Sequence, residues 1–146
     1  MRNCTMRHRT ALDETVCALL GYSRIAVVGL SDKTWRDSYR VAAYMAGHGY
    51  EILAVNPEID QVFGRPSYPD LDAAPKPVEL VDVFRRLEHV PQVFDAAIRA
   101  GAKAVWTQYG LVDEAAAARA RAAGLQVVMD RCLMVEHARH AGANEV

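Results

Sequence analysis

The sequence predicts an α/β fold, in which a doubly wound parallel sheet of five strands carries helices on both faces. Short apolar segments rich in valine and isoleucine alternate with amphipathic or alanine-rich segments of helical length. Continuous apolar runs are typical of strands that are covered on both faces of a parallel sheet. With 146 residues, of which 51% are hydrophobic, the chain suits one domain that buries its own core.

The first elements follow from helical spacing and glycine stops. Residues 1–9 form a basic arm that we expect to be loose, and the domain then extends over residues 10–140. Leucine and valine recur at helical spacing over residues 10–20, and a glycine follows, so we predict a helix there. Residues 24–28 predict the central strand, which ends at Gly29.

The next elements surround a proline-rich segment. Residues 38–47 predict a helix and residues 50–55 a strand, which Asn56-Pro57 stops because proline lacks a ladder donor. Residues 58–77 contain four prolines and predict a long loop that faces a ligand, with room for a short strand at residues 61–63.

The remaining segments repeat the alternation of strand and helix. A proline in the first turn and a glycine at the end bound the helix that follows the third strand. We predict strands at residues 78–84, 104–109 and 126–130, helices at residues 91–100, 113–123 and 133–140, and a frayed tail at residues 141–146.

The turn after the central strand is the first candidate for a ligand site. Gly29 permits a tight turn or a close backbone approach. Four side chains, Ser31, Asp32, Thr34 and Ser38, are candidate N-caps for the following helix. The free N–H groups and the dipole at such a helix start attract an anion, so a phosphate-bearing ligand is expected there.

Polar groups follow every predicted strand. In a parallel α/β sheet the ligand lies at the carboxyl ends of the strands. These ends carry Gly29 and Ser31, Asn56 and Pro57, Phe84 to Arg86, Gln108 to Gly110, and Asp130 to Cys132.

Two common nucleotide patterns are incomplete. The first turn has one glycine where the dinucleotide fingerprint has three, and Asn56-Pro57 stands where an NAD site offers a carboxylate to the ribose. The pattern GxxxxGK[ST] is absent from the sequence. These observations disfavour NAD and give no support to ATP hydrolysis.

An ordered set of segments resembles a known family. The segments are IAVVGLSDKTWRDSYRVAAYM, GYEILAVNP, FGRPSYPDL, VDVFRRLEHVPQVFDAAIRAGAKAVWTQYG and GLQVVMDRC. They cover residues 22–136 and resemble the small stand-alone CoA-binding proteins, whose Rossmann-like domain is similar to the first domain of the succinyl-CoA synthetase alpha subunit. Ligase activity is not implied, because the synthetase needs a phosphorylated histidine in a second domain and a partner subunit.

The resemblance implies a coenzyme A site along the strand ends. It places the turn beside the phosphates, the end of the second strand beside the adenosine, and the end of the third strand further along the rim. The residues that it implies are Gly29, Leu30, Ser31, Asn56, Pro57, Phe84, Arg85 and Arg86.

Arginines are expected to share the negative charge of the ligand. A helix N-terminus supplies only about half a positive charge, whereas CoA carries a pyrophosphate and a 3′-phosphate. Arg36, Arg40, Arg85 and Arg86 are candidates, and one of the last two can instead pair with Glu88 or Asp82. Ser38 and Gln108 are further candidate contacts, and Gln108 stands at the end of the fourth strand.

The three cysteines lack the spacing of a metal site and are odd in number. We expect free thiols in a reducing compartment, and therefore a cytoplasmic protein. Cys132 begins a helix, where a thiolate is favoured, and so is a candidate for a mixed disulfide with CoA. The alternative is a small buried apolar side chain.

The leading hypothesis is a CoA-binding or acyl-CoA-binding protein without catalytic apparatus, acting as a carrier, a sensor or a partner of a CoA-using enzyme. The alternative is an NAD(P)-dependent or acyl-CoA-linked enzyme that uses Asp130, Cys132 or His89. A homodimer or an enzyme partner is compatible with either hypothesis. The net charge of −1 gives no reason to expect nucleic acid or membrane binding, and the histidines show no metal-site spacing.

Overall fold

The structure is a computed structural model that describes Cys4 and residues 10–145. Apart from Cys4, the predicted loose arm lies outside the described residues. The helices are α1 Ala11–Leu20, α2 Asp37–Gly47, α3 Val90–Arg99, α4 Glu114–Ala122 and α5 Leu133–Glu145, with a 3-10 turn η1 at Leu87–His89. The strands are β1 Arg24–Val28, β2 Glu51–Val55, β3 Gln61–Val62, β4 Arg65–Tyr68, β5 Leu80–Val83, β6 Ala104–Thr107 and β7 Gln126–Val128.

The strands form one sheet in the order β3-β4-β2-β1-β5-β6-β7. The five predicted strands are all present and pair in parallel, with β1 at the centre between β2 and β5. Connections from β1 therefore run to both sides of the sheet. The loops after β1 and β5 begin side by side, because Val28 and Val83 are partners in register.

The prediction of five strands was too low, because the sheet continues into the segment expected as a loop. β4 pairs in parallel with β2, and β3 pairs with β4 in antiparallel orientation. Each of these pairings joins only two residue pairs, and β4 contains Pro66. Proline is tolerated in a short strand near the sheet edge, so the proline-rich composition concealed a real strand.

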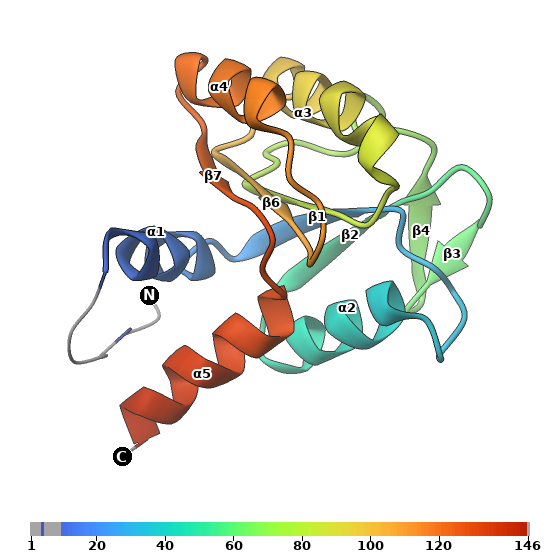
Figure 1. Cartoon of the computed structure of the whole chain (residues 1–146). Coiled ribbons are helices and arrows are strands. Elements are labelled where there is room, and N and C mark those ends of the chain that lie inside the picture. The colour runs from blue at the N-terminus through green and yellow to red at the C-terminus, as the bar shows by residue number, and fades with distance from the viewer. Residues whose placement is uncertain (1–3, 5–9, 146) are drawn as a thin grey trace.

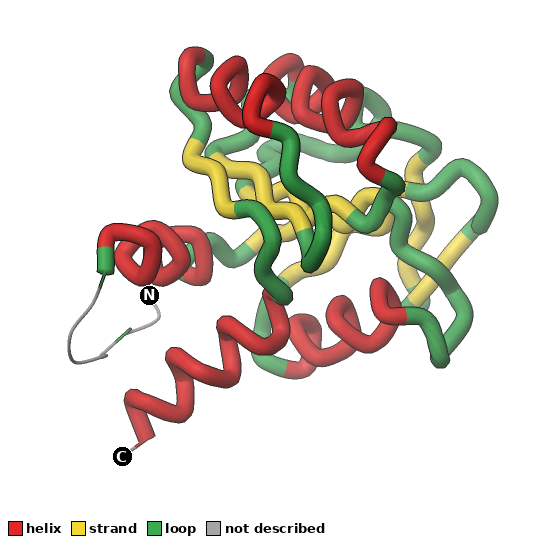
Figure 2. Tube along the Cα trace, viewed as in Figure 1, coloured by secondary structure: helices red, strands yellow, loops and turns green. Residues whose placement is uncertain are grey.

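Helices cover both faces of the sheet, as predicted (Figure 1). Figure 2 shows the strands as a layer with α3 and α4 on one side and α1, α2 and α5 on the other. Alternate residues of β1 pack into the two cores: Ala26 and Val28 face α3 and α4, and Ile25 and Val27 face the opposite helices. Within the described residues, no helix is long and apolar enough to cross a membrane.

Local capping explains where two of the helices begin. Thr10 caps α1: its hydroxyl accepts a hydrogen bond from the Asp13 amide at 3.0 Å, and the Thr10 amide donates one to the Asp13 carboxylate at 3.1 Å. Asp113 caps α4 by accepting from the Ala116 amide at 2.9 Å. The last helix, α5, differs from its prediction and continues past His140 to Glu145.

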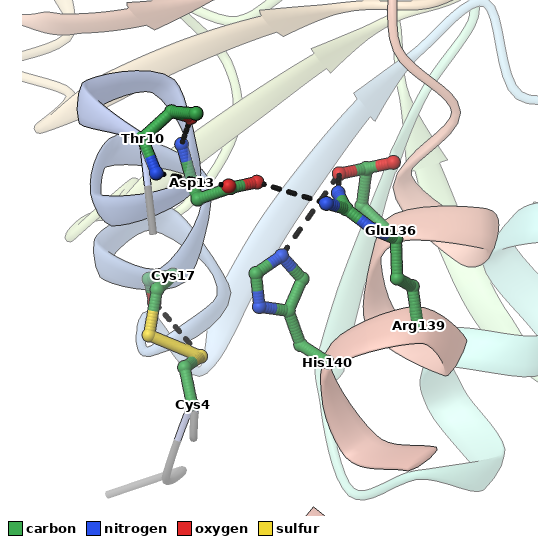
Figure 3. A network of polar contacts seen from close by, with 7 residues as sticks. All are labelled: Cys4, Thr10, Asp13, Cys17, Glu136, Arg139 and His140. Carbon is green, nitrogen blue, oxygen red and sulfur yellow. Dashed lines mark hydrogen bonds and ion pairs between the residues drawn. A yellow bond between two sulfur atoms is a disulfide. The ribbon is translucent and has the colours of Figure 1, made fainter. Parts of the chain in front are cut away.

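A polar network joins the first and last helices (Figure 3). The guanidinium of Arg139 on α5 lies 3.1 Å from Asp13 and 3.0 Å from Glu136. Both carboxylates are largely shielded, with side-chain exposures of 11% and 7%. Arg139 is therefore shared by two carboxylates that have lost most of their water, and the His140 Nε2 atom lies 3.9 Å from the second of them, Glu136.

Cys4 and Cys17 form a disulfide, so the expectation that all three cysteines are free was wrong (Figure 3). Their Cα atoms lie 5.7 Å apart, which is within the normal range for a bridge. The bridge attaches Cys4 to α1. Cys132 is the free cysteine among the described residues, and it is buried.

Candidate functional site

The turn after β1 brings the backbone close to the end of β5. Gly29 has a φ of +89°, a left-handed conformation that side chains rarely adopt. A Cβ atom at this position would collide with the carbonyl oxygen of Phe84. The Gly29 amide also donates to the Val55 carbonyl of β2 at 2.8 Å. Glycine is therefore required where three strand ends converge.

The loop from β1 to α2 is held by hydroxyl groups. Ser38, inside the first turn of α2, accepts from the Ser31 amide at 3.0 Å, and the Ser31 hydroxyl accepts from the Lys33 amide at the same distance. The N-cap of α2 is Arg36, whose side chain makes no capping bond. None of the four residues predicted as N-caps occupies that position. The Arg36 side chain therefore accepts no hydrogen bond from the backbone amides of the first turn of α2.

A polar pocket of about 600 Å³ lies over this loop and the start of α2. Its volume is in the range of small-molecule sites. Six of the predicted site residues line it, namely Gly29, Ser31, Arg36, Ser38, Asn56 and Phe84. The remaining lining residues are Asp32, Lys33, Asp37, Glu58 and Ile59. Leu30 does not line it, because its side chain is fully buried in the core.

Asn56 fixes the shape of the polar pocket from the β2 side. Its side-chain amide donates to the Leu30 carbonyl at 2.9 Å, and its side-chain oxygen accepts from the Glu58 amide at 2.9 Å. Both of its polar atoms are thus used within the protein. Asn56 joins the loop after β1 to the loop after β2.

An apolar pocket of about 510 Å³ adjoins the polar pocket. Phe84 and Asp37 line both, so the two pockets meet at these residues. The apolar walls are formed by Val41, Phe84, Tyr109, Leu111, Cys132 and Met134. Arg40, Arg85, Arg86 and Gln108 add polar groups to the same pocket.

A third pocket of about 270 Å³ lies beside α3. Pro57 lines it together with Arg85 and His89. Arg85 lines both this pocket and the apolar pocket. The predicted site residues therefore lie along one continuous edge of the sheet, except for the buried Leu30.

The four candidate arginines differ in their partners. Arg86 is paired with Glu88 at 3.2 Å, and its side chain is 83% exposed. Arg40 is paired with Asp37 and donates to the Trp35 carbonyl at 2.8 Å. Within the described residues, Arg36 and Arg85 have no carboxylate in ion-pair range, so these two guanidinium groups are the ones available to an anion.

A buried carboxylate near the apolar pocket was not foreseen. Asp82 is fully buried in β5 and accepts a hydrogen bond from the Gln108 side chain at 2.6 Å, so it does not pair with an arginine. Burial, only partly offset by the hydrogen bonds from Gln108 and from the backbone at Val83, raises the pKa of Asp82 to about 7. The aspartate within the apolar run VELVDVF was the available signal in the sequence.

The residues proposed for an enzyme are not brought together. Cys132 lines the apolar pocket and His89 the pocket beside α3. The Asp130 carboxylate accepts from the Gly110 amide at 2.8 Å, which closes a turn. Over residues 10–145 and Cys4, no group of histidine, cysteine and acidic side chains is arranged to hold a metal ion.

Comparisons with known proteins give the family. A model of the CoA binding domain matches residues 23–138. The YneT protein of Bacillus subtilis (strain 168) is 43% identical over 115 residues, which span 79% of this chain and 85% of YneT. A hypothetical protein from Pyrococcus horikoshii OT3 is 37% identical, with a TM-score of 0.86, and the match covers 94% of this chain and 100% of that protein.

A more distant structure shares the fold. The dinucleotide forming acetyl-coenzyme A synthetase 1 of Ca. Korarchaeum cryptofilum matches with a TM-score of 0.65 at 23% identity. The match covers 75% of this chain and 26% of the synthetase. The family model covers residues 23–138, and the relatives of 43% and 37% identity match most of the chain: the chain belongs to the family of CoA binding domains.

Proposed function

We propose that this protein binds coenzyme A or an acyl-CoA at the carboxyl edge of its sheet and carries no catalytic apparatus of its own. The observation that carries the proposal is a pair of arginines, Arg36 and Arg85, which have no carboxylate in ion-pair range among the described residues and line two adjoining pockets in a chain of this family. A guanidinium matches the geometry of phosphate oxygens and stays charged at any physiological pH.

Several features of the polar pocket support binding of a phosphate there. Gly29 lines the pocket and lets the turn pack against the end of β5, and Arg36 stands at the start of α2. The uncapped amides at the start of α2 attract negative charge. The wall also contains Asp32, Asp37 and Glu58, which repel an anion, so a cation on the rim is needed to favour binding.

Isothermal titration with CoA, 3′-dephospho-CoA, NAD and NADP tests the proposal. We expect CoA to bind most tightly and loss of the 3′-phosphate to weaken binding. Arg85→Ala should weaken the affinity for CoA by at least about tenfold, because hydrogen bonds to charged groups contribute about 1.5–3 kcal/mol. Arg86→Ala should weaken the affinity for CoA less than Arg85→Ala does, because Arg86 already pairs with Glu88.

Arg119→Ala is the control for loss of one positive charge, since Arg119 lies on α4 and lines none of the three pockets described above. Tighter binding of NAD or NADP than of CoA would overturn the proposal. Equal losses of CoA affinity in Arg85→Ala and Arg119→Ala would show that Arg85 does not contact the ligand.

The role of a bound CoA is a separate question. Carrier, sensor and enzyme-partner roles stay predictions, as do a homodimer and a cytoplasmic location. Light scattering with and without CoA measures whether the ligand changes the oligomeric state. Alkylation of thiols in intact cells measures whether Cys4 and Cys17 are joined where the protein resides, and a disulfide there would contradict the cytoplasmic prediction.

A further inference from the structure

Asp82 is an unusual residue for the centre of a parallel sheet. It lies on β5, in register with Val27 of β1 and Trp106 of β6, and has no exposed surface. Its Oδ1 atom accepts from Gln108, whereas its Oδ2 atom has no hydrogen-bond partner in the part of the chain that the structure describes. A buried carboxylate with an unsatisfied oxygen destabilises the fold, so its presence calls for a role.

Gln108 connects this carboxylate to the apolar pocket. The glutamine follows β6, is only 9% exposed and lines the pocket. Its Nε2 atom lies 2.6 Å from Asp82. The Asp82 Oδ1 atom accepts this hydrogen bond, so the Nε2 end of the glutamine amide turns inward.

The orientation determines what Gln108 offers to a ligand. With Nε2 held by Asp82, the carbonyl oxygen Oε1 is left, and no donor among the described residues bonds to it. The neighbouring walls are apolar side chains such as Phe84, Leu111 and Met134. An amide N–H that enters an apolar region without an acceptor costs about 1–3 kcal/mol, so an acceptor placed among these apolar walls favours a ligand that carries an amide.

We propose that Gln108, oriented by Asp82, is a specificity-determining residue that accepts a hydrogen bond from an amide N–H of the ligand's arm in the apolar pocket. The inference rests on the proposed CoA function. The arm of CoA that leads to the thiol is a chain with two amide groups, and the anionic end of the same molecule would occupy the polar pocket. Phe84, which lines both pockets, stands at the passage between them.

Titration with two ligands at pH 8 separates the arm from the phosphates. The ligands are CoA and adenosine 3′,5′-bisphosphate, which lacks the arm. We expect Gln108→Leu to weaken CoA about fivefold, the value of one net hydrogen bond, and to leave the bisphosphate unchanged. Gln126→Leu is the matched control, since Gln126 starts β7 at the opposite end of the strands.

Three results would overturn the inference while leaving the proposed function intact. They are equal CoA affinity in the native protein and in Gln108→Leu, an equal loss for both ligands, or a native protein that binds CoA no more tightly than the bisphosphate. A native protein that binds neither ligand would overturn the proposed function and the inference together.

Retained bisphosphate binding shows that the variant is folded. If Gln108→Leu does not fold, Gln108→Asn replaces it, because an amide that is one methylene shorter cannot reach both Asp82 and the ligand. The same selective loss of CoA affinity is expected, and unchanged CoA affinity would count against the inference.

Discussion

Gly29 has no Cβ atom, and this lets the turn after β1 lie against the carbonyl group of Phe84. The position combines a left-handed φ with a contact that no side chain can make. Gly124, after α4, has a similar φ of +93° but open space where a Cβ would lie. The two glycines therefore separate the cost of backbone strain from the cost of a collision.

We expect Gly29→Ala to lower the free energy of unfolding by more than Gly124→Ala, which should cost about 1–2 kcal/mol through strain alone. Gly29→Ala should also weaken CoA binding, because the loop after β1 must move away from Phe84. Denaturant unfolding and titration measure the two effects. Equal losses of stability in both variants would show that the turn adapts without cost.

Asp82 makes stability depend on pH in an unusual direction. Its pKa rises from an ordinary 3.8 to about 7, so between these values the folded protein holds a proton that the unfolded chain has released. The free energy of unfolding therefore falls as the pH rises from about 4 to 7 and this contribution is constant above. The full effect is on the order of 4 kcal/mol at 1.36 kcal/mol per pH unit.

Asp82→Asn should remove this decline and make the protein more stable than the native form at pH 8. Urea unfolding of both proteins at pH 5 and pH 8 measures this change in the free energy of unfolding. Asp95→Asn, at a surface ion pair with half-exposed side chains, is the control and should change the unfolding free energy by less than about 0.5 kcal/mol. If the free energy of unfolding of Asp82→Asn declines with pH as steeply as that of the native protein, other groups cause the decline.

Between elements, one guanidinium links the carboxylates of α1 and α5. Arg139→Ala leaves Asp13 and Glu136 shielded from water without their cation, whereas Arg119→Ala breaks a pair whose partners are each 47% exposed. We expect Arg139→Ala to lower the Tm by several degrees and Arg119→Ala to lower it much less. Thermal unfolding followed by circular dichroism compares them, and similar Tm values would mean that solvent reaches both carboxylates of the network.

The sequence predicted most elements because their signals are local. Helices α1 and α4 begin at residues 11 and 114, next to their capping residues Thr10 and Asp113, and the five main strands are short runs rich in apolar residues. Where a signal depends on tertiary pairing, prediction failed. β4 contains a proline and forms only by pairing with β2 and β3. The expected N-caps of α2 were wrong, because Arg36 holds that position and Ser38 lies inside the helix, where its hydroxyl accepts from the Ser31 amide.

For the whole molecule, the position of the site was easier to predict than its internal contacts. The rule that ligands lie at the carboxyl ends of parallel strands brought almost every candidate to one edge. The rule is silent on partners, so the pairing of Arg86 with Glu88 and of Asp82 with Gln108 could not be read from the sequence. The disulfide between Cys4 and Cys17 was missed for the same reason, because spacing alone does not show that two thiols meet.

The central place of β1 also bears on how the protein is synthesised. Gly29 and Phe84 meet across neighbouring strands although 55 positions separate them in the chain. A nascent chain that has not yet released Phe84 from the ribosome lacks a wall of both adjoining pockets, so its ligand cannot assist the earlier stages of folding. Ligand binding is instead expected to stabilise the protein after β5 has joined the sheet, by slowing the unfolding of the folded chain.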